Sequence, residues 1–303
     1  MLVVAGTLVA FALAMLGSWT RINVAGMTCP DWPLCRGAVV PVLHGGVVLE
    51  WLHRLLAFVE TFIVAAIVLT GLRLRPAIRP LGGMLIALAA VFVLQVLLGG
   101  ATIKFANSPL SVMIHWGAAM LLLAVLTSLS VVAFTYDGSR QAPSPGERRR
   151  GTAPLALATG WAFVAMCAGA YVSSSGAGLA CPSVPACGPA LLGETVPQTL
   201  QMTHRLLAAA LVVFAVAAAV LVPAHQRRAT VALRVALVML ALQVTLGVLN
   251  VLWLLPTALR EAHAANAVAT FLAFVTATVL SSLETASVPV AGRSSRRVVS
   301  GNA

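Results

Sequence analysis

Four histidines stand inside long apolar segments of this 303-residue chain: His53, His115, His204 and His263. An ionisable side chain within a membrane helix is costly, so such a residue usually marks a functional site. Imidazoles that face each other from two helices of a bundle can bind a haem iron from both axial sides. We therefore predict two bis-histidine haem sites, the first formed by His53 and His115 and the second by the other pair. A lone buried histidine is more often a core residue whose hydrogen bonds are satisfied within the protein. That interpretation does not explain well why four histidines lie at a similar depth in the membrane.

Polar residues close to these histidines would complete the two sites. Arg54 and Arg205 each directly follow a histidine, and a guanidinium suits bidentate contact with a haem propionate. The alternative for both arginines is snorkelling to the lipid headgroups. Gln95 and Gln243 could each hydrogen-bond a ligand or a histidine nitrogen, and packing between helices is the alternative.

A carboxylate distinguishes the first histidine motif, E-W-L-H-R, from the second, Q-M-T-H-R. Glu50 stands one helical turn before His53 and on the same face, whereas Gln201 at the matching position cannot ionise. We therefore predict that the first half performs chemistry, with Glu50 transferring a proton or stabilising a cation. An acid favoured by the dipole of a helix N-terminus is the alternative. Glu60 faces the same interior, either as a neutral buried acid or in a proton path.

The cysteines form two pairs with the same spacing, Cys29 with Cys35 and Cys181 with Cys187. Each pair encloses five residues that include two prolines, so each loop is short and stiff enough to close as a disulfide in an oxidising compartment. The disulfides could order the loops or act as a thiol–disulfide relay. Zinc binding is disfavoured, because the spacing is not that of a zinc knuckle. Cys167 has no counterpart and is predicted to be a small core residue.

The composition shows what must position these residues. Hydrophobic residues make up 60% of the chain and charged residues only 9%, whereas soluble domains have about 25% charged residues. A water-soluble fold is therefore excluded, and the continuous apolar runs favour helices over barrel strands. We predict an all-α integral membrane protein with eight transmembrane helices, at about 2–19, 51–72, 81–103, 110–134, 154–172, 203–223, 229–252 and 260–283.

The basic residues predict the orientation of these helices. The loops after the second, fourth and sixth helices and the C-terminal tail hold three, four, two and three arginines, whereas the opposite loops together hold four basic residues. By the positive-inside rule, both termini are cytoplasmic. The net charge of +11 is thus a topology signal with some attraction to anionic lipid, and we predict no nucleic-acid partner.

The two halves of the chain repeat each other. A C-P-x-x-P-x-C motif recurs at an offset of 152 residues, H-R-L-L-A at 151, and both Q-x-x-L-G and a later histidine at 148. The sequence therefore predicts two pseudo-symmetric four-helix bundles related by an axis along the membrane normal. The predicted divisions are 1–135 for the substrate-haem half, 136–153 for a cytoplasmic linker, 154–284 for the b-type haem half, and 285–303 for a basic cytoplasmic tail.

Together, the E-x-x-H-R motif from Glu50 to Arg54, the cysteine pairs, the duplicated histidines and the matching halves resemble the haem A synthase family of eight-helix membrane enzymes. The resemblance covers essentially the whole chain. It implies oxidation of the C8 methyl of haem O to the formyl group of haem A, for terminal oxidases that use that haem. It also implies a substrate haem in the first half, a permanent b-type haem in the second, and Glu50 as the catalytic carboxylate.

The resemblance also sets expectations for location and partners. It implies a bacterial plasma membrane, with the haem sites toward the outer face. Haem O synthase and assembly factors of the terminal oxidase are the expected partners. The reaction also requires an electron acceptor, which the sequence does not identify.

Three other functions fit parts of the pattern. A quinone-linked di-haem b-type electron-transfer protein without haem-modifying activity would explain the histidines but not the difference between Glu50 and Gln201. A transporter of haem or small molecules would have broken helices with polar residues at the midplane, whereas the polar residues here gather at one end. A membrane thiol oxidoreductase would need the cysteines but not the histidines.

Overall fold

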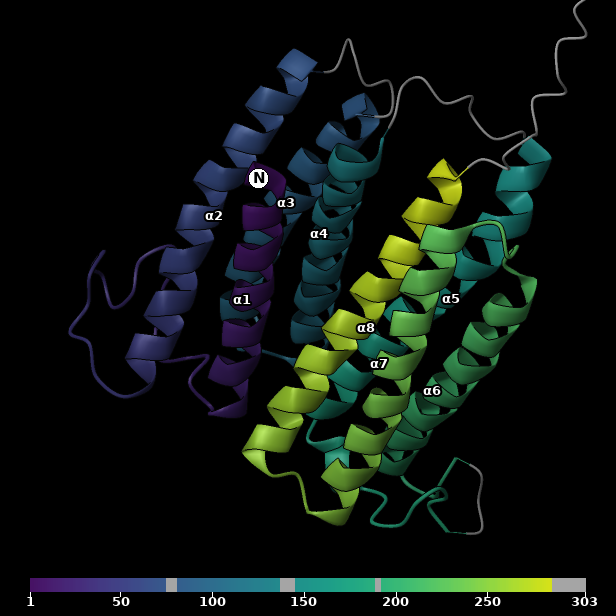
Figure 1. Cartoon of the computed structure of the whole chain (residues 1–303). Coiled ribbons are helices and arrows are strands. Elements are labelled where there is room, and N and C mark those ends of the chain that lie inside the picture. The colour runs from purple at the N-terminus through teal and green to yellow at the C-terminus, as the bar shows by residue number, and fades with distance from the viewer. Residues whose placement is uncertain (75–80, 137–144, 189–191, 285–303) are drawn as a thin grey trace, which may run out of the picture.

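The computed structural model describes residues 1–74, 81–136, 145–188 and 192–284 (Figure 1). These residues form eight long α-helices and one short 3-10 helix, and no β-strand occurs among them. The helices are α1 (Leu2–Ile22), α2 (Gly46–Leu74), α3 (Leu81–Lys104), α4 (Pro109–Thr135), α5 (Pro145–Ser174), η1 (Ala177–Leu179), α6 (Val196–Leu221), α7 (Arg227–Leu252) and α8 (Thr257–Leu283). All eight α-helices are long and apolar enough to cross a membrane, which confirms the predicted all-α, eight-helix membrane fold.

Three helices begin earlier than their apolar segments predict. Helix α2 begins at Gly46 and α6 at Val196, so each extends by at least one turn beyond the apolar run. A capping box stabilises the start of α6, because Thr195 and Gln198 satisfy each other's backbone amides. Helix α5 begins at Pro145, inside the stretch predicted as a linker, and contains Pro154. The remainder of the predicted linker, apart from Tyr136, and the basic tail from residue 285 lie outside the described residues.

The helices of each half contact one another in a ring. In the first half α1 contacts α2 and α4, and α3 contacts the same two helices; in the second half α5 contacts α6 and α8, and α7 contacts the same two. The halves meet where α4 packs on α5 and α8, and where α1 packs on α8. Helices α4 and α8 are therefore the most buried, and their side chains Met120, Leu126 and Phe274 are fully enclosed in one continuous apolar core.

The functional candidates gather at one end of this bundle. The α1–α2, α3–α4, α5–α6 and α7–α8 connections all lie at the lower end in Figure 1, which we call the cysteine-loop end. The four histidines lie within the first three turns of α2, α4, α6 and α8, which all begin at this end. Because α2 and α4 lie diagonally across the first ring, and α6 and α8 across the second, each pair of histidines can approach from opposite walls.

Candidate functional site

Each of the four histidine rings lies against a glycine of the neighbouring helix. A Cβ added to Gly17 would lie 2.9 Å from Cε1 of His53, and one added to Gly169 would lie 2.8 Å from Cε1 of His204. The matching distances to Cε1 are 3.3 Å both from Gly99 to His115 and from Gly247 to His263. A side chain at Gly17 or Gly169 would therefore displace the imidazole. Gly17 and Gly169 are 152 residues apart, which is the same offset as that of the two cysteine motifs. The internal repeat could therefore have identified both glycines from the sequence.

The second histidine pair has an extensive set of hydrogen bonds. Nδ1 of His204 lies 3.1 Å from the carbonyl oxygen of Ala165, and Nε2 of Gln243 lies 3.1 Å from Nε2 of His263. Asn266 donates through Nδ2 to Oε1 of Gln243 at 2.8 Å and to the Met239 carbonyl at 2.9 Å. Such partners orient a ligating imidazole before its ligand arrives. Asn266 was missed by the sequence analysis, because its counterpart in the first half is an alanine.

The first histidine pair has far fewer hydrogen bonds. Nδ1 of His53, Nδ1 of His115 and Oε1 of Gln95 are buried without a hydrogen-bond partner in the described part of the chain. Nε2 of Gln95 lies 3.5 Å from Nε2 of His115, at the limit for a hydrogen bond. Ala118 stands where the second half has Asn266, so nothing equivalent holds the Gln95 carbonyl. The two sites thus share their residues but differ in how firmly those residues are held.

The arrangement fits a haem in each half. Buried polar atoms of His53, His115 and Gln95 lack hydrogen-bond partners among the described residues, so these side chains are not fully committed to contacts within the protein. The glycines let the imidazoles pack closely against the neighbouring helices, and the imidazoles of each pair come from diagonal helices. The structure thereby brings together the residues of each predicted set, whereas iron ligation by the four histidines stays a prediction.

The cysteine pairs form disulfides in both halves. The Cα atoms are 4.6 Å apart in Cys29–Cys35 and 4.9 Å apart in Cys181–Cys187, within the usual range for a disulfide. Cys29 and Cys181 are fully buried beneath their loops. Cys167 is free and half-buried in α5, where it faces Gly117 of α4.

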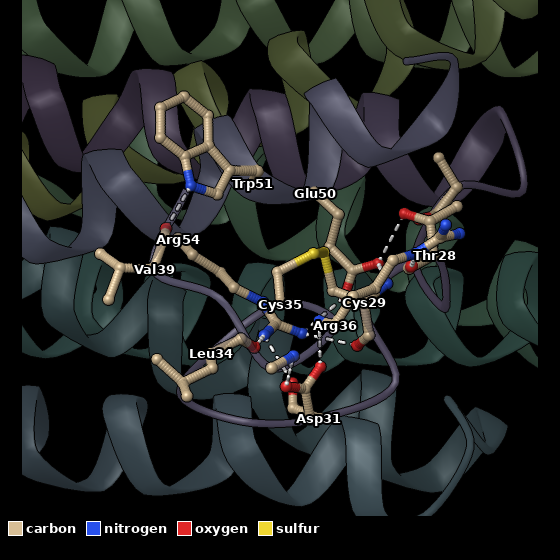
Figure 2. Close-up of a disulfide and its surroundings, with 12 residues drawn as sticks. Thr28, Cys29, Asp31, Leu34, Cys35, Arg36, Val39, Glu50, Trp51 and Arg54 are labelled. Atoms are coloured by element: carbon tan, nitrogen blue, oxygen red, sulfur yellow. Dashed lines mark hydrogen bonds and ion pairs between the residues drawn. A yellow bond between two sulfur atoms is a disulfide. The ribbon is translucent and has the colours of Figure 1, made fainter. Parts of the chain in front are cut away.

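The arginines beside the histidines hold the disulfide loops. Arg54 donates to the carbonyl of Asp31 at 2.6 Å and of Cys29 at 2.8 Å, and also to that of Leu34 (Figure 2). Arg205 repeats this pattern in the second half, donating to the carbonyls of Ser183, Pro185 and Cys181 at 2.7, 3.0 and 2.9 Å. The sequence analysis did not foresee this role, because it depends on loop carbonyls that converge only in the folded chain. The predicted propionate contacts of both arginines stay a prediction.

Glu50 is a buried acceptor at the base of the first loop. Its Oε2 accepts hydrogen bonds from the Cys29 amide at 2.8 Å and the Thr28 hydroxyl at 2.9 Å, and its Oε1 lies 2.8 Å from Nη2 of Arg54 (Figure 2). Gln201 makes the matching contact in the second half, where its Oε1 accepts from the Cys181 amide at 2.6 Å. Both side chains therefore tie a cysteine loop to its helix, but only Glu50 adds a negative charge.

The first loop also reaches α3, next to the glycine that faces His115. The Trp32 ring lies about 3.1 Å from where a Cβ of Gly100 would stand, directly beside the glycine that faces His115. The Asp31 carboxylate accepts from the amides of Arg36 and Gly37 at 2.5 and 2.7 Å. These bonds, above all that from Gly37, hold the pKa of Asp31 below the usual carboxyl value.

Glu60 lies deeper in the membrane than the histidines. It is 1% exposed, and neither carboxyl oxygen has a hydrogen-bond partner among the residues that the structure describes. Its Oε1 would lie 3.6 Å from a Cβ at Gly6 of α1, and the side chains of Ile63 and Ile67 would also lie within 3.2 Å of that Cβ. The matching residue in the second half is Leu211, so the acid is another difference between the halves.

Comparisons with known proteins agree with this organisation. The chain is 29% identical to the haem A synthase of Geobacillus kaustophilus over 266 residues, which cover 84% of each chain. It is 28% identical to that of Bacillus licheniformis over 248 residues, 79% of this chain and 82% of the relative. It is 29% identical to that of Symbiobacterium thermophilum over 219 residues, 69% of this chain and 70% of the relative. Residues 44–275 match the family COX15-CtaA, whose description is cytochrome oxidase assembly protein. With its eight apolar helices, the chain is therefore a multi-pass membrane protein of the COX15-CtaA family of cytochrome oxidase assembly proteins.

Proposed function

We propose that this protein is a haem A synthase, which oxidises the C8 methyl group of haem O to the formyl group of haem A. The relatives named haem A synthase cover most of the chain, and each half supplies a half-buried pair of histidines with matching glycines. The first half binds the substrate haem through His53 and His115. The second half holds a b-type haem through His204 and His263.

One observation carries this division of labour: the histidines and the glutamine of the second site have more hydrogen-bond partners than those of the first site. In the second site, Ala165 orients His204, and Asn266 orients the glutamine that contacts His263. A preorganised site binds tightly, because little ordering is left to be done on binding. The unpartnered polar atoms of the first site suit a ligand that must enter and leave. A substrate has to be released after the reaction, whereas a resident cofactor stays bound.

The resident haem, when bound, would accept and pass on single electrons, because two histidine ligands leave no open iron position. The protein's own contribution to the oxidation is centred on Glu50. Gln201 shows that tying the loop requires only an acceptor, so the charge of Glu50 needs another explanation. We assign Glu50 to proton transfer or to stabilisation of positive charge that develops on the substrate. Thr28 and Arg54 fix its position.

The disulfide loop of the first half covers the substrate site. Trp32 packs over α3 beside Gly99, and Arg54 holds the loop carbonyls in place. A covered site excludes water from a reactive intermediate. A second role proposed for Cys29 and Cys35 is electron exchange through their disulfide. Their place in the loop of the substrate half supports this role.

The expected environment follows from the distribution of arginines. We place the protein in the bacterial plasma membrane, with both termini in the cytoplasm and the cysteine-loop end at the outer face. Haem O synthase would supply the substrate, and assembly factors of the terminal oxidase would receive the product. The electron acceptor is the remaining required partner.

The test is to express the protein with a source of haem O and to identify the extracted haems by chromatography. Wild-type protein should contain haem B together with haem A or a hydroxylated intermediate. The Glu50→Gln variant, which copies the second half at this position, should keep both haems and lose conversion, while His204→Ala should lose haem B. Wild-type protein that yields only haem B would instead support a di-haem electron-transfer protein, and normal conversion by Glu50→Gln would refute the assignment of Glu50.

A further inference from the structure

A polar cluster lies between the two halves at the cysteine-loop ends of α1, α5 and α8. Ser18 donates to Oε2 of Glu261 at 2.8 Å, and Nη2 of Arg21 donates to Oγ of Ser173 at 2.8 Å. Arg21 stands three residues after Ser18 on α1, and Arg260 directly precedes Glu261 on α8, so both arginines belong to this cluster. The cluster therefore joins the first half to the second and contains two cations for one carboxylate.

The positive charge of this cluster is not neutralised within the described residues. Among the described residues, the ion pair that forms is the one between Arg54 and Glu50 on α2. Arg21 therefore has no carboxylate within 4 Å. Arg21 and Arg260 are half-buried, whereas the other unassigned cations at this end, Arg36 and Lys104, are exposed. A guanidinium withdrawn from water without an anion is unfavourable, and an anionic ligand would remove this cost.

The helix register places one of these arginines beside each histidine pair. On α1, Arg21 stands one turn beyond Gly17, the residue that faces His53, and residues four apart share a helix face. On α8, Arg260 precedes His263 by three residues and is likewise one turn nearer the cysteine-loop end. Both arginines thus stand one turn nearer the cysteine-loop end than the level of a histidine, which is the level at which the propionates of a haem bound there would leave the apolar core.

The arginines first predicted for this role are already occupied. Arg54 and Arg205 each donate to carbonyls of a disulfide loop, so their donors hold the protein itself together. We propose that Arg21 binds a propionate carboxylate of the haem in the first site and that Arg260 binds one of the haem in the second. This inference rests on the haem positions in the proposed function. The hydrogen bond from Nη2 of Arg21 to Ser173 restrains the Arg21 side chain.

The test compares haem B with its dimethyl ester, which has no carboxylates, in binding titrations of purified full-length protein. The His204→Ala background reports the first site, and the His53→Ala background reports the second. Arg21→Gln should lower the preference for the free acid in the first site by roughly tenfold, and Arg260→Gln should do so in the second. Arg234→Gln, which removes an exposed arginine of α7, is the charge-matched control and should change neither preference. Arg21→Lys should restore part of the effect, because it keeps the charge but not the bidentate geometry.

Preferences that stay within twofold of the wild-type value in both arginine variants would overturn the inference. A similar loss with Arg234→Gln would also overturn it, because it would show a general charge effect. Retained binding of the ester by the variants shows that they are folded. Conversion of haem O is measured separately, so a wild-type protein that discriminates the ester but makes no haem A would refute the proposed function and leave the propionate site standing.

Discussion

Asn266 should control how firmly the second half retains its haem. Its side chain donates one hydrogen bond to Gln243, which contacts His263, and another to the Met239 carbonyl, at 2.8 and 2.9 Å. The substitution Asn266→Ala copies Ala118 of the first half and removes both bonds. It leaves Oε1 of Gln243 unpartnered, as Oε1 of Gln95 already is.

The magnitude follows from these contacts. Removal of the Asn266 amide leaves the side-chain oxygen of Gln243 without a donor, which costs about 1–3 kcal/mol. Only part of this cost falls on binding, because the fold also loses the bond to Met239. A loss of about 1.4 kcal/mol in binding corresponds to about tenfold weaker affinity, within the range seen for changes behind a metal ligand.

The assay is titration of purified protein with haem B in the His53→Ala background, followed by the Soret absorbance. Asn250→Ala is the matched control, because Asn250 is also buried but its amide donates to the Leu246 and Leu259 carbonyls. Both variants should lose thermal stability, but only Asn266→Ala should lose affinity for haem. Equal affinities in the two variants would refute the argument that hydrogen bonding distinguishes the two sites.

Three further predictions concern single side chains. Glu60→Leu, which copies Leu211, should raise the free energy of unfolding by about 1–3 kcal/mol because it removes an unpartnered buried carboxyl group; a lower melting temperature by scanning calorimetry would contradict this. Gly169→Ala should reduce the haem B content of the second site, because the new Cβ would lie 2.8 Å from His204, whereas Gly160→Ala in the same helix meets no atom within 4 Å and should leave the content unchanged. The pKa of Asp31 is lowered by folding, so its contribution to loop stability is complete above the unfolded carboxyl pKa and is lost as the pH falls through the lower folded value. The protection of the Arg36 and Gly37 amides against hydrogen exchange, relative to the intrinsic rate at each pH, should fall over that range in wild type but not in Asp31→Asn. A parallel response of the two proteins would refute this.

The sequence predicts the helices well because hydropathy over about 20 residues is a strong signal in a membrane protein. It predicts the helix starts less well, since the first turns of α2 and α6 lie beyond the apolar runs and depend on local caps such as Thr195. The histidines, Gln95 and Gln243 could be found because they recur in both halves. Asn266 could not be found in this way, because a residue that differs between the halves leaves no repeat to detect.

The role of the two loop arginines shows a different limit. Their position directly after a histidine suggests a ligand contact, and their side chains do point toward the end of the bundle where the haem edge is expected. The loop carbonyls of Cys29 and Asp31 reach Arg54 only because the disulfide and the Glu50 contact fold the loop back over α2 (Figure 2). Spacing along the chain carries no information about that closure.

The differences between the halves fall into two groups that serve opposite requirements. The first half has acids where the second has Gln201 and Leu211, and a hydroxyl at Thr28 where the second has Ala180. The second half instead has Asn266, which restrains the residues around its histidines. Chemistry requires charge and an exchangeable ligand, whereas retention of a cofactor requires fixed partners. Because the cysteines, arginines, glycines and histidines are common to both halves, exchanging residues between halves changes function on a constant scaffold. Glu50→Gln with Gln201→Glu in one chain should therefore not move the activity to the second half, since His204 and His263 there would still hold their haem firmly.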